Sequence, residues 1–376
     1  MRFFHPVLFA VFLFRSLTGV SASLQSDSLP TTPEFTVFLI GDAGVPVAGG
    51  QDPNLNLLRS QLRTAGKNSA VVFLGDNIYP EGLPDAGAPG RPEAERRLGD
   101  QLNILADYPG RVVFLPGNHD WQRGGGKGWQ YLRNQEKFTE AHLGRGNAFL
   151  PDGGCPGPVE VSLSEAVTLV VLDTQWLLHR GDKPGQESDC PAKDPAALTL
   201  RLDEMLARNR GKQVVVVAHH PMYTYGPHGG YSTWKRHLFP LTEIHPSWYL
   251  PLPGIGSLYA LYRKFLGFSQ DTTHPRNRRA RQPLIETFRK YPGLVYADGH
   301  DHSLQHIERD GLHCVVSGSG SKVSPVKRRG KYARFAAARR GFARLDYVGG
   351  QVWLSFWEPT GSPDGKQVYA TQWKGN

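Results

Sequence analysis

Short apolar runs recur along the chain and end in turns that contain glycine or asparagine. Each run is four to six residues long and almost continuously apolar, which is typical of strands buried on both faces. Helical periodicity separates these runs at about 54–65, 92–107, 129–142 and 195–209. The alternation predicts an α/β fold with a largely central sheet. The predicted strands are Phe35–Ile40, Ala70–Leu74, Arg111–Leu115, Val167–Leu172, Gln213–Ala218 and Leu294–Ala297, with a β-hairpin formed by Gly341–Tyr347 and Gln351–Trp357.

Two stretches interrupt this alternation. Residues 173–194 are polar and include Cys190, and residues 226–282 are rich in proline, glycine and aromatic residues without a clear period. Irregular segments of this length are uncommon in compact domains and often serve as lids or binding loops. Because the chemical motifs described below lie on both sides of these stretches, we expect residues 23–376 to form one domain.

The first residues predict a signal peptide. Val7–Phe14 are eight consecutive apolar residues behind Arg2, and Val20-Ser21-Ala22 offers a small-residue cleavage site. The run is much shorter than the roughly 20 apolar residues of a transmembrane helix. We therefore predict that residues 1–22 are removed, that no transmembrane segment remains and that the protein is secreted or periplasmic. The alternative is an uncleaved membrane anchor.

Export would place the three cysteines in an oxidising compartment. None belongs to a CxxC pair, which argues against a cysteine-ligated metal. Cys155 and Cys190 both lie in loop sequences that contain proline, so a disulfide between them is predicted. Cys314 lies in an apolar run and is expected to be a buried free thiol.

The formal net charge of +9 is unevenly distributed. Residues 231–282 hold eight Lys and Arg against Glu243 and Asp271, and residues 322–344 hold nine with no acid. Such a bias favours anionic partners, which include phosphate esters, nucleic acid and anionic membrane surfaces. The alternative is a solvated basic face, and we expect no dedicated nucleic-acid partner.

Five of the predicted strands are followed by motifs rich in oxygen and imidazole groups. These motifs are Gly41-Asp42-Ala43-Gly44, Gly75-Asp76-Asn77-Ile78-Tyr79, Gly117-Asn118-His119-Asp120, Ala218-His219-His220-Pro221 and Gly299-His300-Asp301-His302. Open α/β sheets bind ligands outside the carboxyl ends of their strands, so the motifs are expected to meet. One such motif is a weak signal, because Asp is common in turns, but five in this order are highly specific. The candidate metal ligands are Asp42, Asp76, Tyr79, Asn118, His219, His300 and His302.

The order GD…GDxxY…GNHD…HH…GHxH resembles that of the calcineurin-like metallophosphoesterases. The tyrosine three residues after Asp76 is similar to that of the purple acid phosphatase branch, and the compact chain resembles its mammalian, tartrate-resistant members. The resemblance covers roughly residues 35–230 and 290–357. It implies a four-layer α/β/β/α sandwich, in which two packed sheets are flanked by helices.

The resemblance also implies a dinuclear centre of Fe(III) and a divalent metal, namely Fe, Zn or Mn. The implied ligands of the ferric ion are Asp42, Asp76, Tyr79 and His302. Those of the divalent ion are the bridging Asp76, Asn118, His219 and His300. Both sets agree with the preference of trivalent iron for carboxylate and phenolate oxygen, and of divalent ions for imidazole and amide groups.

Two further histidines are similar to catalytic residues of the family. His119 resembles the histidine that contacts the phosphate and assists the leaving group, and His228 resembles a second histidine near the substrate. The alternative for His119 is a supporting role beside Asn118. For His228 the alternative is a flexible loop residue.

The activity implied by the resemblance is that of a secreted acid phosphatase, which hydrolyses phosphate monoesters with a metal-bound hydroxide. A phosphodiesterase or nucleotide hydrolase on the same scaffold is the closest alternative, because the metal ligands do not distinguish these substrates. A non-catalytic anion-binding module is less favoured, since all seven ligands are present. The chain contains neither GxSxG nor GxxxxGK[ST], which argues against a serine hydrolase and a P-loop enzyme.

Two features depart from the family pattern. Ala43 stands where relatives often carry a larger residue, and His219 and His300 are 81 positions apart, farther than in compact relatives. We interpret residues 231–282 as an insertion near the pocket and predict that it acts as a lid or substrate-binding wall. Its aromatic and basic residues suit anionic ligands that carry a ring or an acyl group.

Overall fold

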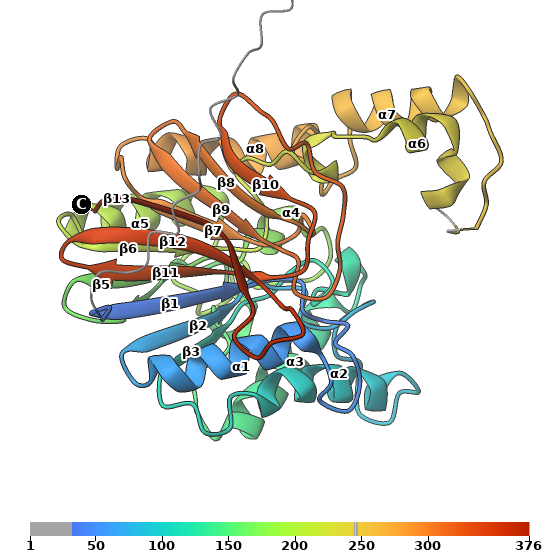
Figure 1. Ribbon diagram of the computed structural model, residues 1–376. Coiled ribbons are helices and arrows are strands. Elements are labelled where there is room, and N and C mark those ends of the chain that lie inside the picture. The colour runs from blue at the N-terminus through green and yellow to red at the C-terminus, as the bar shows by residue number, and fades with distance from the viewer. Residues whose placement is uncertain (1–31, 244, 246, 376) are drawn as a thin grey trace, which may run out of the picture.

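The computed structural model describes residues 32–243, 245 and 247–375. The predicted signal peptide, residues 1–22, lies outside the described residues. The described chain forms two β-sheets that pack face to face, with helices on both outer faces (Figure 1). A search of the described helices finds none with the length and apolar character needed to cross a membrane.

Each sheet combines strands from distant parts of the sequence. Sheet A contains, in spatial order, β13 (Lys366–Lys374), β12 (Gln351–Glu358), β11 (Phe342–Val348), β1 (Phe35–Ile40), β2 (Ser69–Phe73) and β3 (Arg111–Phe114). Sheet B contains β10 (Ala333–Ala337), β8 (Leu304–Arg309), β9 (Leu312–Ser317), β7 (Val295–Asp298), β6 (Gln213–Val217), β5 (Val167–Val171) and β4 (Val159–Ser162). β1, β2 and β3 run parallel, as do β5, β6, β7 and β9.

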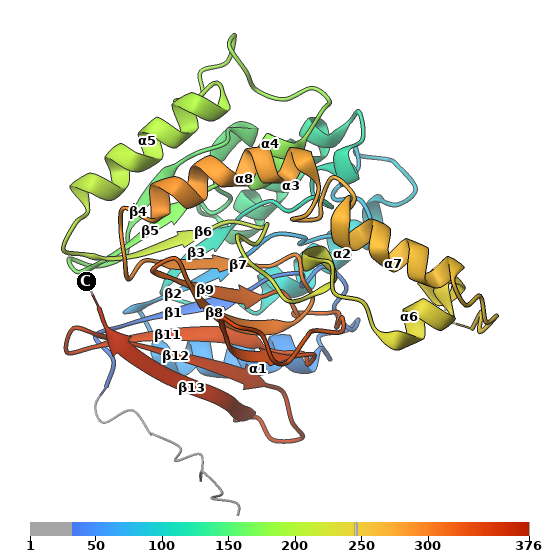
Figure 2. The ribbon, with the colours of Figure 1, turned by 90° about the horizontal axis from the view of Figure 1, so that it is seen from above.

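The helices lie over the outer faces of the two sheets (Figures 1 and 2). Sheet A is covered by α1 (Pro53–Ala65), α2 (Arg91–Asn103) and α3 (Gly128–Leu143). Sheet B is covered by α5 (Pro195–Arg208) and α8 (Pro275–Phe288), with the short α4 (Thr174–Leu178) beside α8. The predicted four-layer α/β/β/α sandwich is therefore confirmed.

Alternate residues of a strand enter different cores, which explains the continuous apolar runs. In β1, Val37 and Leu39 face the core between the two sheets. Phe38 and Ile40 face the core between sheet A and its helices. Because both faces are buried, the strand is almost entirely apolar, and its one polar residue, Thr36, donates a hydrogen bond of 2.6 Å to Asp346 Oδ1.

Most predicted elements are present with small shifts at their ends. Each of the six predicted single strands forms, and β11 and β12 pair as the predicted hairpin around Gly349-Gly350. The predicted helices correspond to α1, α2, α3 and α5, with α2 ending at Asn103 instead of 107. The sequence analysis did not predict β4, β8, β9, β10 and β13.

The predicted disulfide is confirmed. Cys155 and Cys190 are bonded, with their Cα atoms 5.5 Å apart, and Cys314 is a buried free thiol. The disulfide fastens the far end of the irregular stretch 173–194. At the near end of that stretch, Asp173 accepts a hydrogen bond of 2.8 Å from the Trp121 indole, which directly follows the Gly117–Asp120 motif.

The irregular stretch 226–282 contains more regular structure than its sequence suggests. It holds a turn, η3 (Pro227–Gly229), then α6 (Trp234–Leu238), η4 (Pro240–Glu243), α7 (Ile255–Phe265) and the start of α8. Leu284, Ile285 and Phe288 of α8 are buried against sheet B. The boundary expected at residue 282 thus falls inside a core helix, and the projecting part of the insertion is shorter than 231–282.

The parallel strands of both sheets end at the same side of the sandwich, where the sheets approach each other closely. A side chain at Gly41, after β1, would stand 3.0 Å from Gly299 Cα, after β7. The Gly41 amide also donates to the Ser317 carbonyl of β9 over 2.8 Å. This contact brings the strand-end motifs of sheets A and B to one place.

Candidate functional site

Three polar groups from three separate loops meet beside the end of β1. The Tyr79 hydroxyl donates to Asp42 Oδ1 over 2.9 Å and lies 3.1 Å from His302 Nε2. Asp42 Oδ1 and His302 Nε2 are 3.3 Å apart. Asp42 follows β1, Tyr79 lies in the loop after β2 and His302 lies after β7, so both sheets contribute to this group.

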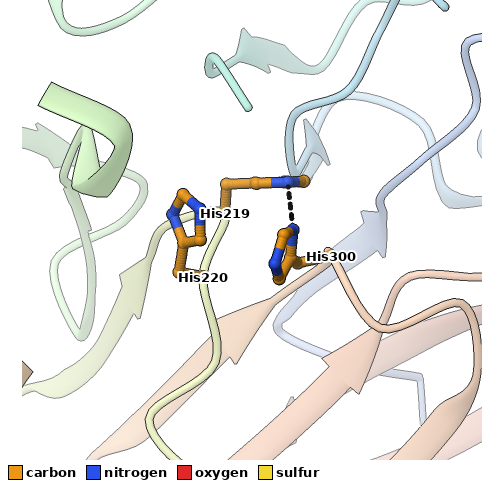
Figure 3. Close-up of side chains that lie close together, drawn as sticks. All are labelled: His219, His220 and His300. Carbon is orange, nitrogen blue, oxygen red and sulfur yellow. Dashed lines mark hydrogen bonds between the residues drawn. The ribbon is translucent and has the colours of Figure 1, made fainter. Parts of the chain in front are cut away.

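A second group surrounds the His219 imidazole. Its Nε2 lies 3.1 Å from Asn118 Oδ1, 3.1 Å from His300 Nδ1 and 3.4 Å from Asp76 Oδ1. Figure 3 shows how the His219 and His300 rings point toward each other from sheet B. The two groups adjoin, because ligand atoms of Asp42, Asp76 and His219 lie within 4.8 Å of one another. The structure thus brings all seven predicted ligands together.

Outer hydrogen bonds orient the two imidazoles. His219 Nδ1 lies 2.8 Å from the Leu74 carbonyl, and His300 Nε2 lies 3.3 Å from the Gln270 carbonyl. A carbonyl only accepts, so these nitrogens carry ring protons, and His219 Nε2 and His300 Nδ1 are the ring atoms that face the other candidate ligands. Outer bonds of this kind orient the imidazole ligands at metal sites.

The third imidazole in Figure 3, His220, has a different role. Its Nδ1 lies 2.8 Å from Thr174 Oγ1, and its Nε2 lies 2.6 Å from Gln270 Oε1. Both ring nitrogens are therefore used by hydrogen bonds, although a ring nitrogen of His220 lies within 4.8 Å of those of His219 and His300. Burial, together with the neighbouring His219, lowers the pKa of His220 to about 3, so the ring is neutral. It anchors Gln270, and through it the insertion, to sheet B.

The charges of the site favour a bound cation. Asp42 and Asp76 are buried carboxylates, and within the described residues neither is ion-paired with a lysine or arginine. Burial by itself would raise the pKa of Asp76, but His219 and His119 lower it below the ordinary value. Burial raises the pKa of the Tyr79 phenol, and the two carboxylates raise it further. A metal cation here would stabilise the two buried carboxylates beyond what the imidazoles supply and would displace the phenol proton.

The spacing of the ligand atoms also suits metal ions. Around an octahedral ion with bonds of about 2.1 Å, neighbouring ligand atoms lie about 3.0 Å apart. The distances from Tyr79 to Asp42 and His302, and from His219 to Asn118 and His300, are 2.9–3.1 Å. The donor set therefore fits two adjoining metal positions, one rich in oxygen and one rich in nitrogen.

The backbone at the site is strained and tightly packed. Asp42, Asp76 and His300 adopt left-handed conformations with φ of 59°, 53° and 66°. Such conformations cost non-glycine residues roughly 1–3 kcal/mol each, so the surrounding packing must enforce them. Gly117 shows this packing, because a side chain there would stand 2.5 Å from Asp76 N and 2.8 Å from His219 Cε1.

A cavity of about 300 Å³ opens in front of the candidate ligands. His119 lines it from the loop after β3. Its Nδ1 contacts the Pro80 carbonyl, so Nε2 is left without the ring proton and lies 3.8 Å from Asp76 Oδ2. Burial lowers the pKa of His119, and Asp76 raises it in part.

His228 also lines this cavity. Its Nδ1 lies 2.8 Å from Asp271 Oδ1, and its ring lies against that of His300 with centroids 3.8 Å apart and an angle of 34° between the ring planes. Asp271 is fully buried and also accepts two hydrogen bonds from Arg263. These contacts link His228 through Asp271 to α7.

Several residues of the site were not identified from the sequence. Asp120, inside the GNHD motif, accepts from the backbone amides of Gly117 (2.7 Å) and Asn77 (3.1 Å) and so joins the loops after β3 and β2. Gln270 and Asp271 approach the site from the insertion. The only available signal for Asp271 was its position as one of two acids in a basic stretch.

Comparisons with known proteins identify one matching family and several proteins of similar fold. The family model described as calcineurin-like phosphoesterase matches residues 35–250. No curated protein matches the sequence. GAP50, the anchor in the inner membrane complex of Plasmodium, has a similar structure, with a TM-score of 0.50, 16% identity, and 92% of this chain and 90% of that chain covered. The purple acid phosphatase PPD1 from yellow lupin (Lupinus luteus) seeds also has a similar structure. Its TM-score is 0.53 and its sequence identity is 14%, with 91% of this chain and 54% of that chain covered. Similarity at these identities is one of fold alone.

The tight packing at Gly117 leads to a testable prediction. In Gly117→Ala, the new Cβ would displace Asp76, because it would stand 2.5 Å from the Asp76 amide. We expect the affinity of metal-depleted protein for Zn²⁺ or Mn²⁺ to fall about 10–100-fold, the usual effect of disturbing the support of a ligand. Calorimetric titration measures this. Gly126→Ala is the control, because its Cβ would have no neighbour within 4 Å. Equal affinities of the two variants would contradict a metal position at Asp76.

Proposed function

This chain belongs to the calcineurin-like phosphoesterase family, and on that basis we propose that it is an acid phosphatase similar to the purple acid phosphatases. Metal-dependent hydrolysis of phosphoesters is the activity of the family. We propose in addition that the substrates are phosphate monoesters and that the metals are Fe(III) and a divalent Fe, Zn or Mn ion.

One observation supports the iron position above all others, namely the convergence of Tyr79, Asp42 and His302. The phenol is buried and directed at a carboxylate and an imidazole, 2.9 and 3.1 Å away. Phenolate and carboxylate oxygens are hard ligands. Trivalent iron prefers such ligands more strongly than softer divalent ions do. A tyrosine with a purely structural role would need only one of these partners.

The divalent position would be held by Asn118, His219 and His300, with Asp76 shared between the two ions. Two bound cations would neutralise the charge of a phosphate group and lower the pKa of a coordinated water. The chain holds the ligands in place beforehand, through the Leu74 and Gln270 carbonyls behind the two imidazoles. Because the two imidazoles are already oriented, they need not move when charge develops during the reaction.

We propose that His228 donates a proton to the leaving oxygen. The Asp271 carboxylate holds its Nδ1 proton, so the other ring nitrogen remains to carry the transferred proton at the cavity. His119 is placed in a similar way by the Pro80 carbonyl and is proposed to contact the phosphate. General acid catalysis by a histidine of this kind contributes typically about 10²–10⁴-fold.

The cavity supports a compact substrate. Its volume of about 300 Å³ is at the lower end of the roughly 300–1,000 Å³ range of ligand cavities. Arg123 supplies positive charge for the phosphate, and Phe268 supplies an apolar ring for the alcohol. Arg263, Phe268 and Asp271 come from the insertion, which supports its predicted role as a substrate-binding wall.

We also propose that the protein is exported after removal of residues 1–22. The Cys155–Cys190 disulfide supports this, because disulfides persist mainly in oxidising compartments.

Tyr79→Phe tests the iron position. The substitution keeps the ring and removes the oxygen ligand. Oxidised wild-type protein should be purple to pink, because a phenolate bound to ferric iron absorbs visible light by charge transfer. The variant should remain folded, lose this absorption and bind iron more weakly, as measured by visible spectroscopy and elemental analysis. Tyr249→Phe, at an exposed position, is the matched control and should keep the colour.

Two results would count against the iron position. The first is an unchanged spectrum and iron content in Tyr79→Phe. The second is a colourless wild-type protein that is fully loaded with metals but contains no iron, which would leave a phosphoesterase of another metal composition.

His228→Asn tests the proton donor and the substrate class together. The Asn amide can replace Nδ1 as the donor to Asp271, whereas the proton-transferring nitrogen is lost. At acidic pH, wild-type protein should hydrolyse aryl and alkyl phosphate monoesters faster than an aryl phosphate diester. The variant should lose roughly 10²–10⁴-fold in kcat on the alkyl ester, and less on p-nitrophenyl phosphate, whose leaving group needs no proton. Exposed His142 provides the control substitution, His142→Asn.

The possible outcomes separate the alternatives. Equal losses on both monoesters would refute the role of His228 as proton donor. Faster turnover of the diester by wild-type protein would favour a phosphodiesterase. Absence of turnover in fully metal-loaded protein would favour an anion-binding module.

A further inference from the structure

The described residues 231–243, 245 and 247–268, here called the arm, project from the body of the protein in both views (Figures 1 and 2). The arm consists mainly of α6, η4 and α7. Its two ends lie side by side, since a side chain on Gly230 would stand 2.9 Å from Lys264 Cα. The chain therefore leaves the sandwich at the start of the arm and returns to it at nearly the same place.

The large apolar side chains that the protein exposes are concentrated on the arm. Within the described residues, eleven of the fourteen exposed large apolar side chains belong to it. They are Trp234, Trp248, Tyr249, Leu250, Ile255, Leu258, Leu261, Tyr262, Phe265, Leu266 and Phe268. Apolar patches of this kind are rare on soluble proteins and mark sites of interaction.

The pattern of α7 shows that this exposure is built into the helix. Its buried residues are the small Gly256 and Ala260. Gly256 packs against the α6 backbone so closely that a side chain would stand 2.7 Å from the Arg236 carbonyl. The larger residues, Ile255, Leu258, Leu261, Tyr262 and Phe265, are left on the surface. Small residues thus hold the two helices together, and large ones are presented outward.

Positive charge accompanies the apolar side chains. Lys235 and Lys264 are exposed on the arm, whose sequence contains a single acid, Glu243. At its root, Lys327 lines one cavity together with Leu261 and Lys264. Lys327 begins the exposed basic run Lys327-Arg328-Arg329, so the second basic segment of the sequence meets the arm there.

We propose that the arm docks the protein on anionic lipid bilayers. Tryptophan and tyrosine favour the boundary between acyl chains and headgroups, and lysine and arginine beside them attract anionic lipids. A short helix with an apolar face and basic flanks lies in the plane of this boundary. A protein partner fits less well, because protein interfaces are depleted in lysine. Lipid binding is independent of the proposed hydrolysis, and the two can be measured separately.

Vesicle co-sedimentation tests the proposal. Purified protein should bind vesicles of phosphatidylcholine with about one-third phosphatidylglycerol more tightly than vesicles of phosphatidylcholine alone, and the difference should shrink with added salt. Leu258→Ser combined with Phe265→Ser should weaken partitioning at least about tenfold, because both side chains lose their apolar contact with the lipid. Leu200→Ser, at an α5 residue exposed to 60%, is the control and should bind like wild type.

The folding of each variant is checked by its turnover of a soluble phosphate ester and by circular dichroism. Three results would overturn the proposal. The first is equal vesicle binding by the arm variant and wild type, and the second is no binding by wild type to anionic vesicles. The third is a dimer in sedimentation-velocity analysis that is lost in the arm variant, which would assign the apolar surface to a second copy of this chain.

Discussion

The burial of two carboxylates, Asp42 and Asp76, at the junction of the two sheets is the constraint on which the rest of the site depends. Removing negative charge from water is costly unless positive charge accompanies it. In the described part of the chain, imidazoles and backbone amides surround these carboxylates, and no lysine or arginine forms an ion pair with them. Metal cations bound among these groups would supply the positive charge that the carboxylates and the Tyr79 phenol favour.

The same constraint explains the glycines and the strained residues. The sheets must approach closely for ligands of both to reach one ion, and this approach excludes a side chain at Gly117 and Gly299. Asp42, Asp76 and His300 turn into the site through left-handed backbone. Strained backbone at three candidate ligands is typical of functional sites, where the surrounding packing enforces a conformation that costs stability.

The sequence predicted which residues would meet at the site, because each candidate ligand follows a buried apolar strand and parallel strands end at a common edge. It could not predict Gln270, whose contacts with His220 and His300 depend on how the chain returns from α7. Nor did it reveal α8, because arginines and the internal Pro283 obscure its helical period. The short β8, β9 and β10 were missed because polar positions and turns interrupt their apolar pattern.

The insertion connects the outside of the protein with the site. Its exposed arm leads into the segment that lines the cavity, and there Asp271 holds His228 while Gln270 holds His300. One stretch of sequence thus supplies residues that line the cavity and a surface that projects from the body. The proposed function of the cavity rests on two metal positions that share Asp76.

Anomalous diffraction from crystals of protein with its native metals tests this claim most directly. The account predicts two metal peaks about 3.5–4 Å apart on either side of Asp76, with iron in the position beside Tyr79. A single peak, or metal bound out of reach of the Asp76 carboxylate, would contradict it.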